Sequence, residues 1–487
     1  MNHMTEAEFH RAISMWGLAI CILAAAAGWV FMRFGQAWSI ADLPTSDYVA
    51  QIVPAYVVTE VALIPVGGKL VDRYGVRAVL GIAPFIYIIG SLLCVVSVSV
   101  VMLIMFRLVQ GAGAGLMLAL GFSAVGKFYE GANRGKCNEL MTAAFAVGSL
   151  FGTALGFFLT DNFNWRAGFV VLSLLMMIGT VMAAHFLPEE EGRVSVPFNS
   201  FGLFSVSLLF AIGTLYTQMV NNNFELVSTT SMLFAVTIIV LTILLFHRSR
   251  RAKYPAVPVH ASWFERIMFV LMFMFSLCGL GLITYYFKLY LTFYEFDIYR
   301  ASVMFLVMLA GAAGPSIIGS RKVYQTGARP WIVVGSVLTA CGLMLTHFIA
   351  DEGVPQLAIS LFAFGLGLGC IVTQIICSLQ TVVPREHMGL HIGNLMAIRM
   401  VGILVGNAII GSYINNVINR DRGENVIDLS TGEDLMTALT QHISAGIAYV
   451  ADALADGFLS SAFILAVMAA LLTLLALKLG KDDLEEH

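Results

Sequence analysis

Fourteen long apolar runs constrain this chain more than any other feature of its sequence. They lie near residues 13–35, 48–68, 78–97, 99–125, 138–160, 166–187, 200–219, 229–247, 265–293, 300–319, 330–349, 355–377, 388–416 and 457–479. An α-helix of about 20 apolar residues spans the roughly 30 Å hydrocarbon core of a bilayer. Because 59% of the residues are hydrophobic and only 12% are charged, we interpret each run as a spanning helix of an all-α membrane protein.

The distribution of Lys and Arg orients these helices. Alternate connections, together with both tails, hold most of the basic residues, and the opposite connections hold only Arg166, Arg300, Arg420 and Arg422. Basic residues gather on the cytoplasmic side of membrane proteins. We therefore expect a multi-pass protein with both termini in the cytoplasm.

One long connection, residues 417–456, is expected on the outer side. Its acidic, turn-rich start is followed by an amphipathic helical pattern at 433–455. The segment is either a cap over an exit or a tether between the last two helices.

Composition and motif content exclude several classes of function. The formal net charge is −3, so the sequence carries no overall basic signal for nucleic acid or anionic lipid, and we expect no partner of either kind from its net charge. The ten histidines and seven cysteines show no metal-ligand spacing, and the sequence contains neither a nucleophile elbow nor a nucleotide-binding loop. We therefore predict a protein that is not an enzyme and that uses no metal and no cofactor.

A glycine-rich, charged stretch, GGKLVDRYGVR at 67–77, connects the second and third runs. Its glycines permit a tight turn and close helix approach, and its charges can lock or release neighbouring helix ends. We assign this conformational role to Gly68, Asp72, Arg73, Gly75, Arg77 and, in the connection after the fourth run, Arg134.

A stripe of small residues marks the fifth run, where Gly148, Gly152 and Gly156 recur every four residues. Such a smooth helix face lets another helix pack closely and is common in membrane bundles. We therefore assign these glycines to helix packing.

Three ionisable residues, Glu60, Arg107 and Arg399, lie deep inside apolar runs. A charge at that depth is costly unless it is paired or wet, so each belongs either to an interhelical pair that fixes packing or to a water-filled cavity or proton relay. Glu60 is the one carboxylate at such depth, on the helix face of Tyr56, and Gln110 shares the face of Arg107. We assign Glu60, Arg107 and Gln110 to proton coupling and charge relay.

Two further cations lie near the expected outer ends of their helices. Arg33 lies near the end of the first run, and Lys288 lies within ITYYFKLYLTF at 283–293. Each either reaches the membrane interface or lines a central cavity. The candidates for the cavity lining are Arg33, Tyr56, Tyr285, Tyr286, Lys288, Tyr290 and Arg399. A cavity lined by these cations would suit an anionic or zwitterionic amphiphile.

Several of these motifs resemble those of a known family. The 67–77 stretch resembles the loop signature of the major facilitator superfamily, RLVQGAGAG at 107–115 its fourth-helix motif, and GSLFGTALG at 148–156 its fifth-helix antiporter motif. Fourteen helices in this order resemble the family's drug:proton antiporter branch. The chain departs from that branch at Gly28, near the place of an acid, and at Thr153, in the place of a proline.

The resemblance implies two six-helix bundles, at 1–190 and 261–487, with an inserted helix pair and linker at 191–260. It implies proton-coupled export of amphipathic compounds by alternating access across a bacterial cytoplasmic (inner) membrane. We expect a monomer whose partners are a small-molecule substrate, protons and membrane lipid. Transport of a specific anionic metabolite or chelator, in either direction, is one alternative. Because the first-helix acid and fifth-helix proline are missing, a non-transporting receptor or assembly factor is another.

Overall fold

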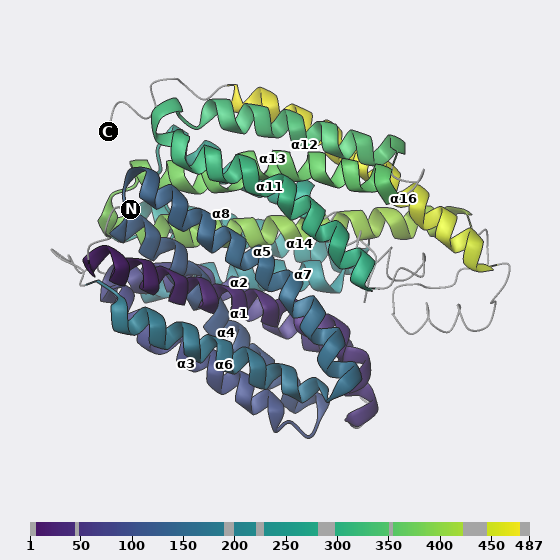
Figure 1. The fold of residues 1–487 in the computed structure, drawn as a ribbon, viewed down its shortest axis with the longest axis horizontal. Helices are drawn as coiled ribbons and strands as arrows, with labels where there is room; N and C mark the ends of the chain where they lie inside the picture. Colours follow the sequence, from purple (N-terminus) through teal and green to yellow (C-terminus); the bar gives the residue numbers. More distant parts are fainter. Residues whose placement is uncertain are drawn as a thin grey trace. The chain divides into compact units, whose positions relative to one another are not determined.

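The structure is a computed structural model that describes residues 6–43, 48–188, 199–220, 228–280, 298–349, 354–421 and 446–477. Long α-helices make up nearly all of these ranges (Figure 1). They are α1 (Glu6–Asp42), α2 (Ile52–Tyr74), α3 (Val76–Val95), α4 (Val100–Phe128), α5 (Gly131–Asn162), α6 (Trp165–Phe186), α7 (Ser200–Met219), α8 (Thr229–Arg251), α9 (Trp263–Phe275), α11 (Ile298–Thr326), α12 (Arg329–Ile349), α13 (Val354–Val382), α14 (Met388–Asp421) and α16 (Gly446–Ala476). Each of the predicted apolar runs overlaps one of these helices.

Within the described ranges, 12 helices are long and apolar enough to cross a membrane. The remaining two are α9, which passes at Phe275 into a π-helical turn (Ser276–Leu280), and α16, whose apolar stretch covers Ser460–Leu474. The predicted continuation of the α9 run to 293 lies outside the described residues. The all-helical membrane fold is therefore confirmed, whereas a topology of fourteen spans stays a prediction.

The connection predicted at 417–456 is shorter than expected, because α14 continues to Asp421 and α16 already begins at Gly446. Helical hydrogen bonding does not stop where an apolar run stops, so the helices extend beyond it at both ends. The predicted amphipathic pattern at 433–455 lies mostly outside the described residues.

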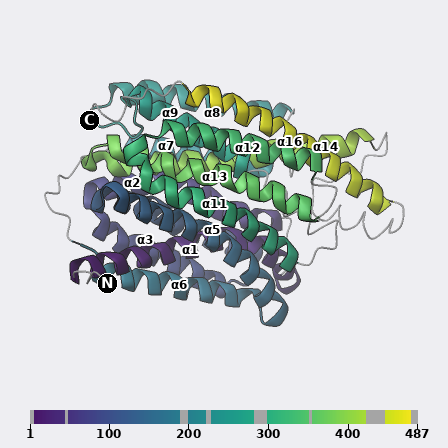
Figure 2. The same cartoon turned by 45° about the horizontal axis from the view of Figure 1, so that its top comes forward.

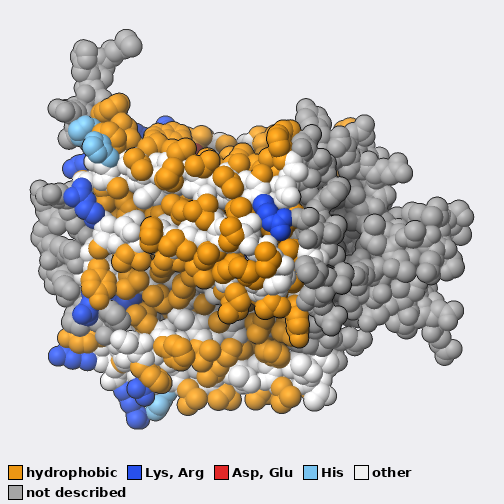
Figure 3. Space-filling model, turned by 90° about the horizontal axis from the view of Figure 1, so that it is seen from below, with side chains coloured by type: hydrophobic (Ala, Val, Ile, Leu, Met, Phe, Trp, Pro, Cys, Tyr) orange, Lys and Arg blue, Asp and Glu red, His pale blue; other side chains and the backbone are white. Residues whose placement is uncertain are grey.

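The surface matches that of a protein embedded in lipid. Figure 3 shows one face on which hydrophobic side chains dominate, while Lys, Arg and His gather mainly toward its left end. Apolar side chains exposed on α3, such as Ile82 and Phe85, and on α6, such as Val181, would contact lipid tails rather than water.

The chain forms two compact units. The first consists of Met1–Ile212, Leu241–Ala261 and Ile376–Ala397, and the second of Gly213–Val240, Ser262–Ile375 and Ile398–His487. In the first unit, α1 packs on α5 and α6, and α4 packs on α2 and α3 (Figures 1 and 2). In the second unit, α12 packs on α16. The predicted division at residues 190 and 260 stays a prediction.

The two units repeat the same crossing of three helices. In each unit a glycine-alternating stretch lies between two neighbours: GAGAG of α4 between α2 and α3, and GLGLG of α13 between α11 and α12. The backbones approach at Gly111–Tyr56, Gly115–Glu60 and Gly113–Tyr87 in the first unit, and at Gly365–Met308, Gly369–Ala312 and Gly367–Thr339 in the second. Such close approach favours helix association where apolar burial gives no driving force.

A further helix pair in each unit extends this repeat. The predicted packing stripe of α5 lies on the backbone of α1, and the corresponding glycines of α14 lie on α9 and its π-helical turn. These contacts are Gly148–Leu23 and Gly152–Ala27 in the first unit, and Gly402–Phe273 and Gly406–Leu277 in the second. Glycines with positive φ, Gly75 at 83° and Gly327 at 76°, separate α2 from α3 and α11 from α12. The same pairwise glycine contacts therefore occur among five helices of each unit.

Single methyl groups test these crossings. Gly115→Ala or Gly369→Ala would place Cβ against the backbone of α2 or α11, which cannot yield without moving a helix. We expect each variant to lower the free energy of unfolding by about 1–3 kcal/mol. Gly81→Ala and Gly213→Ala, where Cβ meets nothing within 4 Å, should leave stability unchanged or raise it by about 0.5–1 kcal/mol. Thermal unfolding in detergent micelles measures the difference, and equal midpoints for all four variants would contradict it.

Candidate functional site

The guanidinium of Arg107 lies fully buried in the first unit, with 0% of the residue exposed. Both Nη1 and Nη2 donate to the carbonyl oxygen of Gly28 in α1 at 3.1 Å, and Nη1 also donates to Gln110 Oε1 at 2.7 Å. The ring of Tyr56 lies 4.3 Å from Cζ. Backbone, amide and aromatic groups therefore stabilise this cation, and none of its hydrogen-bond partners in the described chain is a carboxylate.

Gly28 stands near the place where the antiporter branch carries an acid, and the structure gives a reason for the exchange. A Cβ at this position would lie 2.6 Å from the Tyr87 hydroxyl and 3.1 Å from the Tyr56 hydroxyl. These hydroxyls instead donate to carbonyl oxygens of α1, Tyr56 to Ala25 at 2.7 Å and Tyr87 to Ala24 at 2.8 Å. The side chains of Tyr56 and Tyr87 thus fill the space beside Gly28 that the side chain of a first-helix acid would need.

Gln110 connects Arg107 to a third helix. Its Oε1 accepts from the guanidinium, and its Nε2 donates to Ser91 Oγ of α3 at 2.6 Å. Gln110 and Ser91 are both fully buried. The predicted pairing of Arg107 with Gln110 thus extends into a hydrogen-bonded chain that joins α1, α4 and α3.

Glu60 lies on α2, one helical turn after Tyr56, and 1% of it is exposed. Neither carboxyl oxygen has a hydrogen-bond partner among the described residues. A buried carboxylate without hydrogen bonds costs several kcal/mol, and Glu60 therefore differs from Arg107, in which only Nε lacks a partner among the described residues.

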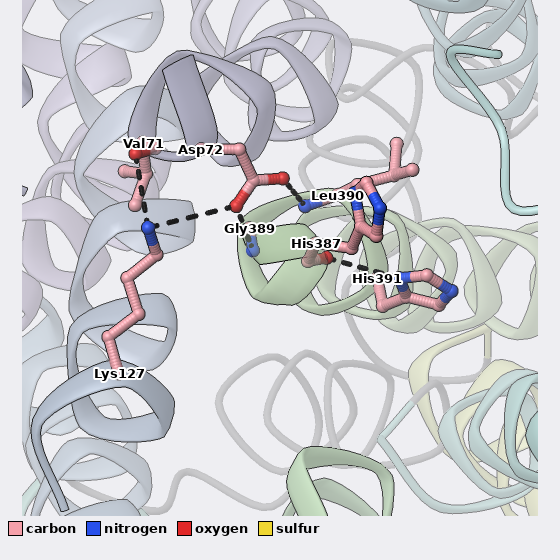
Figure 4. Close-up of polar contacts among 7 residues, drawn as sticks. All are labelled: Val71, Asp72, Lys127, His387, Gly389, Leu390 and His391. Carbon is pink, nitrogen blue, oxygen red and sulfur yellow. Dashed lines mark hydrogen bonds and ion pairs between the residues drawn. The ribbon is translucent and has the colours of Figure 1, made fainter. Parts of the chain in front are cut away.

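A second cluster lies where α2 ends, around Asp72 (Figure 4). The buried Asp72 carboxylate accepts from two backbone amides at the start of α14, Gly389 N to Oδ1 at 2.7 Å and Leu390 N to Oδ2 at 2.8 Å. Lys127 Nζ lies 4.0 Å from Oδ1 and donates to the Val71 carbonyl oxygen at 3.4 Å. The carboxylate therefore caps the positive end of α14 and is itself balanced by a lysine.

Glycines allow this contact to form. Gly68 of α2 lies directly on the backbone of Gly389, and Gly393 is the next contact along α14. Side chains at Gly68 or Gly389 would separate the helices and withdraw the amides from Asp72. Gly68 and Asp72, both assigned from the sequence, thus meet at one helix crossing within the first unit.

Arg134 forms a third set of contacts beside this crossing. Its guanidinium donates to three carbonyl oxygens: Nε to Tyr129 at 2.8 Å, Nη1 to Gln380 at 2.7 Å and Nη2 to Gly126 at 3.3 Å. The end of α13 is thereby bound to the connection between α4 and α5.

A buried amide pair strengthens the same contact. Asn138 Nδ2 donates to Gln380 Oε1 at 2.6 Å, and Gln380 Nε2 donates to the Phe122 carbonyl oxygen at 2.9 Å. Sequence reasoning missed Asn138 and Gln380, together with Lys127 and Gly389. Asn138 opens the fifth predicted run and Gln380 follows the twelfth, and an amide at such a position was the available signal.

The other assigned loop residues hold the turn between α2 and α3. Gly75 closes α2 with a hydrogen bond from its amide to the Val71 carbonyl oxygen at 3.0 Å. Arg77 Nη2 donates to the Leu187 carbonyl oxygen, just after α6, at 3.1 Å, and the Arg73 guanidinium lies 5.3 Å from the Tyr74 ring. Gly75 and Arg77 therefore fix the turn.

The remaining assigned residues lie elsewhere in the described chain or outside it. Arg399 is buried in the part of α14 that belongs to the second unit, and Gly156 is buried in α5. The predicted cavity residues Tyr285, Tyr286, Lys288 and Tyr290 lie outside the described residues, as does the side chain of Arg33. Their assignment to a cavity stays a prediction.

A comparison of the sequence with models of protein families identifies the family of this chain. The model of the Major Facilitator Superfamily matches residues 2–407. The chain belongs to this superfamily. The family resemblance of its motifs is therefore confirmed, and the protein is a multi-pass membrane transporter rather than an enzyme.

Similar proteins include several bacterial transporters. The multidrug transporter protein MdtP of Bacillus subtilis (strain 168) is 24% identical over 400 residues, which cover 80% of this chain and 73% of that relative. The methylenomycin A resistance protein of the same organism is 25% identical over 372 residues, covering 74% of this chain and 78% of that relative.

Solved structures of the superfamily share the fold. The human organic anion transporter MFSD10 (TETRAN) has a TM-score of 0.65 at 14% identity, covering 97% of this chain and 100% of that chain. The proton:xylose symporter XylE, bound to 6-bromo-6-deoxy-D-glucose, has a TM-score of 0.61 at 14% identity, covering 95% and 94%. At this identity the likeness concerns the fold alone.

Amide hydrogen exchange tests the contact between Asp72 and α14. Asp72→Asn keeps the side-chain shape but removes the charge and replaces one acceptor by a donor. Hydrogen bonds to a charged group contribute about 1.5–3 kcal/mol, so exchange in peptides covering residues 388–393 should become about tenfold faster or more. Glu130→Gln is the matched control, because Glu130 pairs with Arg385 just before α14 but both side chains are exposed. Equal exchange rates in the two variants would argue against the cap.

Proposed function

We propose that this transporter is a proton-coupled exporter of amphipathic organic compounds that works by alternating access, as in the fourteen-helix drug:proton antiporters. The observation that carries the proposal is the Glu60 carboxyl group, buried without a hydrogen-bond partner one helical turn from the ring that stacks on Arg107. Relatives named as multidrug transporters and resistance proteins support the substrate class. We further propose a monomer in the bacterial cytoplasmic (inner) membrane, with both termini in the cytoplasm.

Glu60 would be the proton site. As a carboxylate in its present surroundings it carries the cost of an unpaired buried charge, and a proton on the carboxyl group removes that cost. A rearrangement that brings the carboxylate to the Arg107 guanidinium or to water would favour release of the proton. The Arg107 guanidinium, held in place by Gln110 and Tyr56, would then stabilise the deprotonated carboxylate of Glu60.

The Asp72 cluster would supply the conformational step. Both carboxylate oxygens bind the first turn of α14, so moving that turn breaks two charge-assisted hydrogen bonds together. Arg134 and Gln380 add a second point of attachment at the end of α13. We infer that the start of α14 leaves α2, and the end of α13 leaves α4 and α5, during the alternating-access cycle.

Proteoliposomes with an imposed pH gradient test the proton site. We expect wild-type protein to drive efflux of a fluorescent lipophilic dye under the gradient. In Glu60→Gln, which cannot exchange a proton, gradient-driven flux should fall by about tenfold or more, while substrate exchange without a gradient continues. Glu130→Gln, which changes an exposed carboxylate outside the membrane spans, should behave like wild type.

The outcomes of this assay separate the alternatives. Gradient-driven flux that persists in Glu60→Gln would remove Glu60 as the proton site while keeping the transporter. Wild-type protein that moves no substrate under any gradient would instead favour a receptor or assembly factor on the same fold.

The anionic alternative depends on cations whose side chains lie outside the described part of the chain. If Arg33 and Lys288 line the cavity, Lys288→Ala and Arg33→Ala should each weaken binding of an anionic amphiphile by about tenfold, because each removes one charge from an enclosed site. Equilibrium binding to purified variants measures this change. Unchanged affinity in both variants would exclude the alternative.

A further inference from the structure

A dense group of cations lies where α8 ends. Arg248, Arg250 and Arg251 occupy the last turn of α8, and Lys253 follows in the linker. All four side chains are exposed. Residues 248–261 contain neither Asp nor Glu, so no acid within this segment balances the group. The segment belongs entirely to the first unit.

Aromatic rings lie against three of these cations. The guanidinium of Arg248 lies 4.3 Å from the ring of Phe201 at the start of α7, and that of Arg250 lies 4.4 Å from the ring of Phe246. Lys253 Nζ lies 5.5 Å from the ring of Tyr254. Each contact leaves the cation exposed while it restricts its position. Rings at the end of an apolar helix are typical of the headgroup layer of a membrane.

An exposed apolar surface runs from this basic end along the helices. Ile243 and Leu244 of α8 are 62% and 59% exposed, and Phe204 of α7 is 64% exposed. An acyl chain can lie against such side chains while its phosphate reaches the arginines. A free phosphate, in contrast, would gain nothing from the apolar part of the surface.

A packed base supports the cations. Leu203, Val206, Leu245 and Ala256 form a buried cluster that joins α7, α8 and the linker. The carbonyl oxygen of Ala256 also accepts from Asn394 Nδ2 of α14 at 3.4 Å. The basic end of α8 and its linker are therefore fixed within the first unit, which lowers the entropy cost of binding a ligand.

We propose that Arg248, Arg250, Arg251 and Lys253 form a binding site for the phosphate headgroup of anionic phospholipids, whose acyl chains lie along the exposed face of α7 and α8. Charge complementarity and the adjoining apolar surface together select this occupant. The site is independent of the transported substrate, since it involves neither Glu60, Arg107 nor Asp72.

Lipid binding to the purified full chain in detergent tests the proposal. Native mass spectrometry with added dioleoylphosphatidylglycerol or dioleoylphosphatidylcholine counts bound lipids and gives their affinities. We expect wild type to prefer phosphatidylglycerol by about tenfold or more, and R248Q/R250Q/R251Q to lose that preference. The preference in wild type should also fall as salt is raised, because the cations are exposed.

Matched variants distinguish a site from general charge. R321Q/K322Q/R329Q removes three cations near the turn between α11 and α12 and should keep the wild-type preference. F201A/F246A keeps every charge but removes two stacking rings, and should weaken phosphatidylglycerol binding several-fold. The proposal would be overturned if R248Q/R250Q/R251Q and R321Q/K322Q/R329Q lost the preference for phosphatidylglycerol equally. It would also be overturned if R248Q/R250Q/R251Q kept the full preference. Full displacement of the lipid by millimolar inorganic phosphate would overturn it in favour of a free-anion site.

Discussion

Burying charge where water is scarce is the constraint on which the rest of this structure depends. Arg107 is bound through Nη1 and Nη2 by the carbonyl oxygen of Gly28, Asp72 by two amides at the start of α14, and Arg134 by three carbonyl oxygens. Helices can offer backbone groups to a neighbour only where few side chains intervene, so the glycine crossings and the buried charges occur together. Glu60 breaks this rule, because its carboxyl group is buried and receives no hydrogen bond within the described residues.

The repeated crossings show that the two units share packing but not chemistry. Arg107 lies four residues before GAGAG, and Leu361 takes that place before GLGLG. Backbone contacts that involve Glu60 in α2 involve Ala312 in α11. Glycines recur because both units must bring three helices together, whereas among the described residues the polar chain of Arg107, Gln110 and Ser91 lies in the first unit. A proton site that depends on this chain of hydrogen bonds would therefore belong to the first unit.

Sequence reasoning located the described helices and the family, because an apolar run of spanning length and a charged loop motif are both local features. It also paired Arg107 with Gln110, which lie three residues apart on one helix. It could not find Asn138 with Gln380, or Asp72 with Gly389, because these partners lie hundreds of residues apart. The two similar glycine stretches, GAGAG and GLGLG, were a visible sign of the repeat.

By itself, then, the sequence determined an all-helical membrane protein, its family, and which residues carry charge inside apolar runs, since each follows from residue type and spacing along one helix. Only the tertiary structure decided what each charge meets. It set the carbonyl oxygen of Gly28 against Arg107, left Glu60 without a hydrogen bond among the described residues, and brought the start of α14 onto Asp72. The reason is physical: burial and hydrogen bonding depend on neighbouring helices, and no single helix specifies its neighbours.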